Sequence, residues 1–375
     1  MRVLHVITGL DAGGAEHQLR LLLRRLPVEC EVATLSNPGS VARAIRADGT
    51  EVHELSMTSN RDVTVVPRLA RLIRRGGFEI VHTHLYRACV HGRVAARLAG
   101  VPAVATEHSL GDGVIEGRRT SAGVRALYLA TERLGRMTIA VSGAVADRLL
   151  AWGVPARRIT VIPDGIEPTE FRFDPRIRRA ARYRLGIASG TPVIGAVGRM
   201  VPGKRFDLLV RALVGLPGAV LLLVGGGPAG PALLRQAARL GVANRVIVTG
   251  EAADTRELYC AMDLFASPSP QETFGLAVLE ALASGLPAVY ACCPALDEAP
   301  FSGTWRRIDS AHSLHRALAA ELTAVRERGE ARLPLPAVVN RYDIARLAGA
   351  VEDLYERIAP SVPRIVPPVP EGEFL

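Results

Sequence analysis

Two glutamates stand eight residues apart in the second half of the chain, and their surroundings indicate ligand binding. Glu280 is the only charged residue between Gly275 and Gly285, and its neighbours are aliphatic. A carboxylate among packed aliphatic side chains is costly unless something hydrogen-bonds to it, and the vicinal hydroxyls of a sugar would do so. A lone charge in a helix usually marks only a solvent-facing turn. Glu272, just before the helix, supplies a second carboxylate and favours the ligand hypothesis.

One loop of the same half offers two cations. Gly198-Arg199 ends an apolar run over Val193–Val197, and Lys204 follows five residues after the arginine. A planar guanidinium and a compact ammonium could converge on one diphosphate. Lys204 is the only lysine among 46 basic residues. Taken alone, such loop charges are more often solvated, but the nearby glutamate pair favours a joint site.

Glycines and a helix start would complete an anion site. Gly225-Gly226-Gly227 follows a second apolar run and lets the backbone approach a ligand closely. A helix is predicted to begin near Phe274 or Gly275, and its free amides, over Phe274 to Leu276, would attract an anion. In the first half, Gly13-Gly14 follows the opening apolar run in the same way.

Short apolar runs alternate with amphipathic stretches twice along the 375 residues, which predicts an α/β protein of two doubly wound, Rossmann-like domains facing a central cleft. In open parallel sheets, ligands bind beyond the carboxyl ends of the strands. The predicted strands cover Arg2–Ile7, Glu31–Leu35, Glu51–Leu55, Ile80–His84, Ala103–Glu107, Thr138–Val141, Ile159–Ile162, Val193–Val197, Val220–Val224, Arg245–Thr249, Leu264–Ser267 and Ala288–Ala291.

The predicted boundaries follow breaks in this alternation. The stretch from Pro163 to Pro175 has no clear period and is a linker candidate. We expect an N-terminal Rossmann-like domain over 1–165 and a C-terminal Rossmann-like domain over 166–342. A last helix over 343–358 would return to the first domain, and a proline-rich mobile tail would follow over 359–375.

The chain resembles the retaining, nucleotide-sugar-dependent glycosyltransferases of family 4, which have the two-domain GT-B fold. Glu272 and Glu280 match that family's E-x7-E signature, and Gly198-Arg199 with Lys204 is similar to its G-R-x-x-x-x-K loop. In place of the usual Gly-Gly-x-Pro-Glu element, this chain has Cys292 to Glu298, so we expect a different loop there. Further similar segments are Gly13-Gly14, Val81 to His84, Glu107-His108, Val141-Ser142, Ile162 to Gly165 and Glu272 to Pro287.

The resemblance implies that the domain over 1–165 binds the acceptor and the domain over 166–342 binds the nucleotide-sugar donor. It also implies a role for each matching residue. Arg199 and Lys204 would hold the donor diphosphate, Glu280 the ribose hydroxyls and Glu272 those of the transferred sugar. His108 would reach the sugar from the first domain. Catalysis would thus rest on His108, Glu272, Arg199 and Lys204. The remaining donor-binding positions would be the Gly13-Gly14 backbone near the phosphates, Gly250, Glu251 and Ala252 around the base, and the amides of Phe274, Gly275 and Leu276.

We expect no metal and no cofactor other than the nucleotide-sugar substrate. The sequence has no convincing Asp-x-Asp pair, so fixed cations and the helix dipole would stabilise the leaving diphosphate. The acceptor would be a hydroxyl compound, and a glycan, a lipid-linked precursor and a small natural product are all open. His82, His84 and His108 end neighbouring predicted strands and raise a metal hypothesis, but strand ends at a substrate cleft would collect histidines regardless.

The composition indicates in which cellular compartment the protein works and which kinds of partner it binds. Hydrophobic residues make up 49% and charged ones 22%, while the net charge of +9 favours anionic partners. Five cysteines without a C-x-x-C pattern argue against a disulfide framework and for a reducing cytoplasm. No apolar run reaches the ~20 residues that a membrane span needs. The arginine-rich amphipathic stretch from Val65 to Arg75 could contact an anionic membrane on its inner face, and a solvated helix is the alternative.

Three other function classes remain open at this point. A nucleotide-sugar epimerase would need carboxylates in the cleft of the first domain, where Glu107 is the obvious one, and would leave the paired glutamates unexplained. A nucleic-acid binder is suggested only by charge, because aromatic residues are 5% of the chain and offer no stacking platform. A binding module without catalysis is the third alternative.

Overall fold

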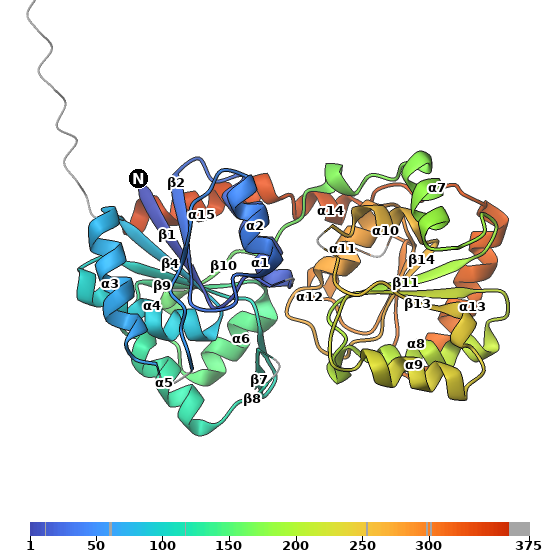
Figure 1. Cartoon of the computed structure of the whole chain (residues 1–375), viewed down its shortest axis with the longest axis horizontal. Coiled ribbons are helices and arrows are strands. Elements are labelled where there is room, and N and C mark those ends of the chain that lie inside the picture. The colour runs from blue at the N-terminus through green and yellow to red at the C-terminus, as the bar shows by residue number, and fades with distance from the viewer. Residues whose placement is uncertain are drawn as a thin grey trace, which may run out of the picture.

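The computed structural model describes residues 1–11, 13–59, 62–116, 118–252, 254–297, 299–300 and 302–359. Two lobes lie side by side, each with a β-sheet flanked by helices (Figure 1). This is the α/β architecture that the alternation of apolar runs predicts. The sheets take strands from residues 2–161 and 193–307, and the domain boundaries at 165 and 342 stay predictions.

The first lobe contains a seven-stranded parallel sheet in the order β10-β9-β5-β4-β1-β2-β3. Its strands are β1 (Arg2–Ile7), β2 (Glu29–Thr34), β3 (Val52–Glu54), β4 (Ile80–His84), β5 (Ala103–Glu107), β9 (Met137–Ala140) and β10 (Ile159–Val161). Its helices are α1 (Gly14–Leu23), α2 (Gly39–Ala47), α3 (Val65–Gly76), α4 (Tyr86–Ala99), α5 (Ala122–Glu132) and α6 (Gly143–Trp152). Each predicted strand is present to within two residues.

A small antiparallel sheet in the first lobe was not predicted from the sequence. It joins β6 (Leu110–Gly111), β7 (Val114–Ile115) and β8 (Arg118–Arg119). Strands of two residues are too short to show the alternation by which a strand is recognised.

The second lobe has a six-stranded parallel sheet in the order β13-β12-β11-β14-β15-β16. The strands are β11 (Val193–Val197), β12 (Val220–Val224), β13 (Val246–Val248), β14 (Leu264–Ser267), β15 (Ala288–Tyr290) and β16 (Trp305–Arg307), the last of which was not predicted. The helices are α7 (Pro175–Arg184), α8 (Phe206–Ala212), α9 (Gly230–Arg239), α10 (Arg256–Ala261), α11 (Leu276–Ala283), α12 (Pro294–Asp297), α13 (Ala311–Arg328) and α14 (Ala337–Arg341).

Two chain segments cross between the lobes next to each other. Ile166 and Asp343 form an isolated parallel bridge at this crossing. Helix α15 (Ile344–Ile358) then lies on the first lobe, where Val351 and Leu354 pack in one buried cluster with Val3 of β1 (Figure 1). The first lobe is therefore completed by the end of the chain. Apart from Ala359, the tail over 359–375 lies outside the described residues.

Helix α3 packs its apolar face against the first-lobe sheet, although the sequence analysis considered this helix for contact with a membrane. Val65, Leu69 and Ile73 are buried in a cluster with Leu4 and Val81 of the sheet. Because these apolar side chains already pack inside the first lobe, only the arginine-rich face of α3 is available to contact a membrane or another partner. Within the described part of the chain, no helix is both long and apolar enough to span a bilayer.

A candidate active site between the two lobes

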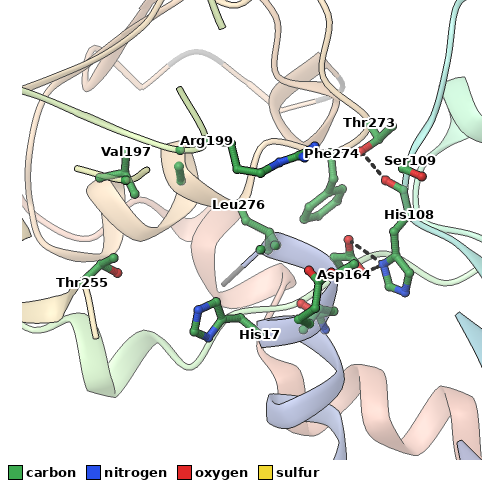
Figure 2. A pocket seen from close by; sticks show the side chains of 18 of the residues that line it. His17, His108, Ser109, Asp164, Val197, Arg199, Thr255, Thr273, Phe274 and Leu276 are labelled. Carbon is green, nitrogen blue, oxygen red and sulfur yellow. Dashed lines mark hydrogen bonds and ion pairs between the residues drawn. The ribbon is translucent and has the colours of Figure 1, made fainter. Parts of the chain in front are cut away.

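A cleft of about 760 Å³ separates the lobes, and the carboxyl ends of both sheets contribute to its walls (Figure 2). The structure gathers nearly all of the predicted site residues here. Those that line the cleft are Gly13, Gly14, His108, Arg199, Lys204, Glu251, Ala252, Glu272, Phe274, Gly275, Leu276 and Glu280. Gly250 is not among the lining residues, and its carbonyl instead accepts a hydrogen bond from the amide of Gly225 at 3.0 Å.

The loop after β11 and the loop after β14 meet through an ion pair. The Lys204 ammonium lies 2.6 Å from Oε1 of Glu272. Gly198 allows this approach, since its φ of 147° places the chain where a side chain would be strained and the lysine stem passes beside it. The cation and the carboxylate that the sequence assigned to one ligand are thus direct neighbours.

Arg199 lies at the end of β11 and extends into the same cleft (Figure 2). Within the described ranges, no carboxylate lies within 4.0 Å of its guanidinium, and no hydrogen bond to its side chain is present. An exposed, unpaired guanidinium at a strand end can bind an anion without first breaking a protein contact.

Glu280 of α11 is held by a tyrosine that the sequence analysis did not identify. The Tyr259 hydroxyl lies 2.6 Å from Oε2 of Glu280 and also 3.2 Å from the carbonyl of Ala277. Burial raises the pKa of Glu280 to about 7, and the hydrogen bond from Tyr259 opposes that rise. Tyr259 lies on α10, 21 residues before Glu280, and nothing in its local sequence indicated this contact.

The start of α11 faces the cleft with unused backbone donors. Gly275 is the residue before the helix, with a φ of 109°, and a Cβ there would collide with the sulfur of Cys293. Only glycine fits both constraints. In the described part of the chain, no acceptor is bonded to the amides of Phe274, Gly275 and Leu276. The last helical residue is Ala283. Gly285 follows with a left-handed φ of 68°, and the amide of Leu286 donates to the carbonyl of Ala281, so this glycine terminates the helix.

His108 of the first lobe faces this helix start across the cleft (Figure 2). Its Nδ1 lies 3.1 Å from Oδ1 of Asp164, and its Nε2 lies 3.2 Å from Nδ1 of His84. Burial lowers the pKa of His108, but the Asp164 carboxylate outweighs this effect and raises it overall. The imidazolium is therefore the favoured form at mildly acidic pH.

Two hydroxyl groups tie the Glu272 loop to the first lobe. The Thr273 hydroxyl donates to the carbonyl of His108 at 2.7 Å (Figure 2). The Ser142 hydroxyl donates to the carbonyl of Thr273 at 2.7 Å. Val141-Ser142 was among the segments that resemble the family, whereas Thr273 carried no signal of its own. These two contacts set the position of Glu272 relative to His108.

The first-lobe wall adds ionisable groups that the sequence analysis did not single out. Glu16, in the first turn of α1, lines the cleft, and burial raises its pKa. A Cβ at Gly13 would meet the flexible end of the Glu16 side chain, so the carboxylate would have to move aside. Arg87 lines the same wall, and among the described residues no carboxylate or carbonyl accepts from its guanidinium.

The remaining sequence hypotheses have mixed outcomes. Glu107 is fully buried in β5 and does not line the cleft. Glu298 lies outside the described residues. His82 and His84 are neighbours, with ring centroids 4.2 Å apart, and His84 contacts His108. The structure adds His5 from β1 to this group.

Two parallel α/β lobes facing one cleft, with cations and carboxylates at the strand ends, define a protein of the GT-B class. The family models agree with this class. The model described as Glycosyltransferase Family 4 matches residues 12–170, and the model described as Glycosyl transferases group 1 matches residues 191–326.

Relatives named D-inositol 3-phosphate glycosyltransferase are similar over much of the chain. The protein from Mycobacterium tuberculosis is 30% identical over 339 residues, which cover 81% of this chain and 69% of the relative. The one from Nocardia farcinica is 35% identical over 241 residues, 58% of this chain and about half (52%) of the relative. The chain belongs to the family-4 glycosyltransferases of the GT-B fold.

A solved structure shares the fold over almost the whole chain. Anabaena HepE, in a crystal structure in complex with UDP-glucose, superposes with a TM-score of 0.84 at 22% identity, covering 95% of this chain and 100% of that chain. The sequences have diverged far more than the arrangement of the two lobes.

Proposed function

We propose that this protein transfers a sugar from a nucleoside-diphosphate sugar to a hydroxyl acceptor, with retention of the anomeric configuration and without a metal ion. The observation that carries the proposal is the joint placement of Arg199, Lys204 and the free amides of α11 on one side of a cleft that also contains the two glutamates. Positive groups gathered around one point are what a diphosphate leaving group requires.

The donor would lie along the second lobe. In this arrangement Arg199 and Lys204 bind the diphosphate, Glu280 accepts from the ribose hydroxyls, and Glu272 accepts from the transferred sugar. The backbone around Glu251 and Ala252 contacts the base. Anabaena HepE was crystallised in complex with UDP-glucose, and its shared fold supports a nucleotide-sugar donor for this chain.

The reaction would break the bond between the anomeric carbon and the phosphate oxygen and form a bond between that carbon and the acceptor oxygen. Both events take place on the same face of the sugar, and the acceptor proton passes to the departing phosphate. Negative charge grows on the leaving diphosphate, so Arg199, Lys204 and the α11 dipole lower the barrier there. No side chain has to act as a general base.

The acceptor would bind against the first lobe and carry an anionic group beside its reacting hydroxyl. Arg87 supports this, because it is a cleft-lining guanidinium that no described carboxylate neutralises. The relatives' name, D-inositol 3-phosphate glycosyltransferase, specifies a phosphorylated polyol for those proteins. A phosphate on the acceptor would be a matching ligand for Arg87.

Contact with an anionic membrane remains a separate hypothesis, together with the cytoplasmic location. Since α3 buries its apolar face, contact would be electrostatic, through arginines such as Arg71 and Arg75. Sedimentation with vesicles containing phosphatidylglycerol at low salt would test it. A protein that stays in the supernatant has no such contact.

The experiment for the main proposal is a thermal-shift panel of UDP-, GDP-, dTDP- and ADP-sugars, each with and without EDTA. We expect one base to stabilise the protein equally in both conditions. Lys204→Ala should lose the shift. An EDTA-sensitive shift would contradict metal independence, and the absence of any shift would contradict the donor class.

An epimerase on the same fold is the main competitor. Such an enzyme would convert the donor with no acceptor present. The structure weakens this alternative, because Glu107, the carboxylate it would use, is buried away from the cleft. Chromatography of the donor after incubation without acceptor distinguishes the two.

A further inference from the structure

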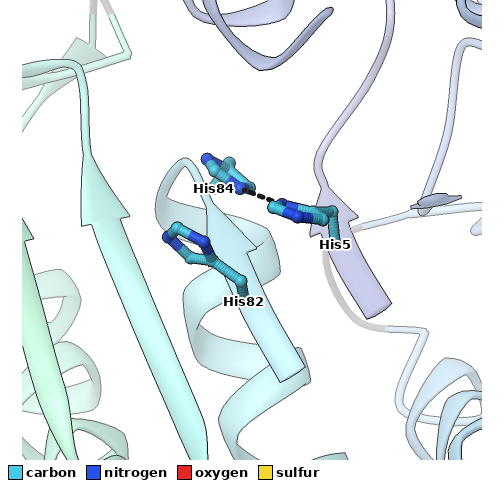
Figure 3. A group of neighbouring side chains, drawn as sticks. All are labelled: His5, His82 and His84. Atoms are coloured by element: carbon cyan, nitrogen blue, oxygen red, sulfur yellow. Dashed lines mark hydrogen bonds between the residues drawn. The ribbon is translucent and has the colours of Figure 1, made fainter. Parts of the chain in front are cut away.

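Three imidazoles form a continuous line from the cleft into the sheet of the first lobe. His108 follows β5, His84 ends β4, and His5 lies within β1. Nε2 of His108 is 3.2 Å from Nδ1 of His84, and Nε2 of His84 is 3.0 Å from Nδ1 of His5 (Figure 3). Both separations are within hydrogen-bond length, and each pair of rings is close to parallel, at 25° and 21°.

The two hydrogen bonds between the three rings require that the protonation of each ring fits that of its neighbour. Each N···N contact needs one N–H donor and one bare nitrogen, so the proton arrangement of one ring dictates that of the next. When His108 is protonated at both nitrogens, Nε2–H donates to His84. His84 must then carry its proton on Nε2 and donate to His5. When His108 is neutral, with its proton on the Asp164 side, both links reverse.

Burial keeps the inner members of the line neutral. His5 and His84 are 0% and 1% exposed, and desolvation lowers the pKa of His5 to about 3 and that of His84 well below its usual value. His84 therefore accepts a hydrogen bond from a cationic neighbour without becoming a competing cation. Its position at the last residue of β4 places it directly behind His108.

We propose that His84, backed by His5, is a positioning residue that holds His108 as an imidazolium against Asp164 in the cleft. This inference rests on the proposed function and on the role that the family resemblance implies for His108, which would reach the transferred sugar from the first domain. With both N–H groups bonded inside the protein, His108 has no free proton to offer a ligand. It acts on the donor as a fixed positive charge, which suits a reaction whose proton passes between substrates.

The groups around His108 set the sign of the pH dependence. The Asp164, Glu16 and Glu107 carboxylates favour the imidazolium, and the neighbouring His5, His82 and His84 rings are neutral. The cation is present below its pKa and is lost as the pH rises through it. His84 forms a hydrogen bond with both forms of His108, but the bond donated by the imidazolium is charge-assisted and stronger. Removing His84 therefore costs the protonated form more, so the pKa of His108 should fall.

A metal ion is the competing explanation for this cluster. His5, His82 and His84 offer nitrogens within 4.8 Å of one another. However, five of the six ring nitrogens already have partners, because His82 contacts the Tyr355 hydroxyl at 2.5 Å and the Thr106 hydroxyl at 2.6 Å. Of these six nitrogens, only Nε2 of His5 is buried without a hydrogen-bond partner. We therefore favour the hydrogen-bonded line.

The test is nitrogen NMR of the full-length protein with labelled histidine, titrated without ligand, using His84→Leu and His84→Asn as matched variants. The Asn oxygen can take the place of Nδ1, whereas Leu cannot accept. We expect the His108 midpoint to fall by about one pH unit in the Leu variant and by less than about 0.3 in the Asn variant. The high-pH fall of kcat should shift with it, while the donor KM changes little and the Asn variant retains most of the activity.

Several outcomes would overturn the inference. These are an unchanged His108 midpoint in folded His84→Leu, a neutral His108 at pH 6 in the wild type, or one equivalent of zinc in the purified protein by elemental analysis. If His84→Leu does not fold, His5→Leu should produce a smaller shift in the same direction. Binding of UDP, measured by calorimetry, tests the proposed function separately, because the ligand-free titration needs no substrate.

Discussion

The ammonium of Lys204 lies 2.6 Å from the carboxylate of Glu272, so the ligand-free cleft pairs the two groups that we assign to different parts of the donor. A diphosphate bound at Lys204 would have to replace this partner, and Glu272 would become free to accept from sugar hydroxyls. The exposed fractions of the two side chains, 29% and 16%, allow such an exchange. Donor binding would thus prepare the sugar site.

Chemical labelling can test this placement, because Lys204 is the only lysine of the chain. Pyridoxal phosphate followed by borohydride should modify Lys204 and the N-terminal amine alone. We expect UDP to protect Lys204 and leave the N-terminal amine reactive, since only Lys204 lines the cleft. Peptide mass spectrometry measures both sites. Equal labelling of Lys204 with and without UDP would contradict a diphosphate site there.

Glu272→Gln should separate binding from catalysis. Removing the carboxylate frees Lys204, and a part-exposed ion pair contributes about 0.2–1 kcal/mol, so UDP should bind up to about five-fold more tightly. Transfer should nevertheless slow by roughly 100-fold, because a contact to the reacting sugar is lost. Calorimetry and initial rates measure the two effects. Glu321→Gln, on helix α13 and paired with Arg306 outside the cleft, is the control for a general loss of negative charge. Equal changes in both variants would argue against a specific role for Glu272.

Glu280 should make stability depend on pH. Its folded-state pKa of about 7 lies above the ordinary value of 4.5, so the folded protein binds this proton more tightly than the unfolded chain. Stability from this group is fully present below about pH 4.5 and is lost as the pH rises through 7. Glu280→Gln should therefore raise the free energy of unfolding by about 1–3 kcal/mol at pH 8, with the gain shrinking toward pH 5. Urea unfolding at both pH values measures it, and a gain that is the same at pH 5 and pH 8 would refute the assignment.

The same glutamate should link donor binding to protons. A carboxylate that accepts from ribose hydroxyls binds best when ionised, so UDP should bind more weakly below pH 7 and release a proton from Glu280 on binding. Calorimetry in buffers of different ionisation enthalpy at pH 6.5 counts that proton. Glu280→Gln corrects for the titration of UDP itself, and an identical proton count in the variant would exclude Glu280 as the source.

Thr273→Val should loosen the contact between the lobes. The variant loses the hydrogen bond to the His108 carbonyl but keeps the volume of the side chain. We expect a stability loss of about 0.5–1.5 kcal/mol and a fall in kcat of about ten-fold, because Glu272 is no longer fixed relative to the first lobe. Thermal unfolding and initial rates measure these effects. Thr323→Val, on the outer helix α13, is the control. Similar kcat values in the two variants would contradict the claim that the hydrogen bond from Thr273 to His108 positions Glu272 for catalysis.

Much of the fold could be predicted from local patterns. The runs at Val193–Val197 and Val220–Val224 form strands with those bounds, because a strand covered on both faces is apolar throughout. The strands β6 to β8 could not be predicted, since each is only two residues long. Strand β16 has two exposed arginines after Trp305, so it lacks the apolar run that marks the equally short β13 and β15. Gly275 was predicted to lie at the start of a helix. The structure adds why this position is a glycine, because the sulfur of Cys293 lies too close to leave room for a side chain.

The sequence by itself determined which residues meet at the cleft, because the carboxyl ends of parallel strands share one edge and their loops must gather there. Only the tertiary structure decided which partner each of those residues has. Tyr259 with Glu280, Lys204 with Glu272, and His5 with His84 are 21, 68 and 79 residues apart. Such contacts depend on sheet register, helix packing and the approach of the two lobes, which no local pattern encodes.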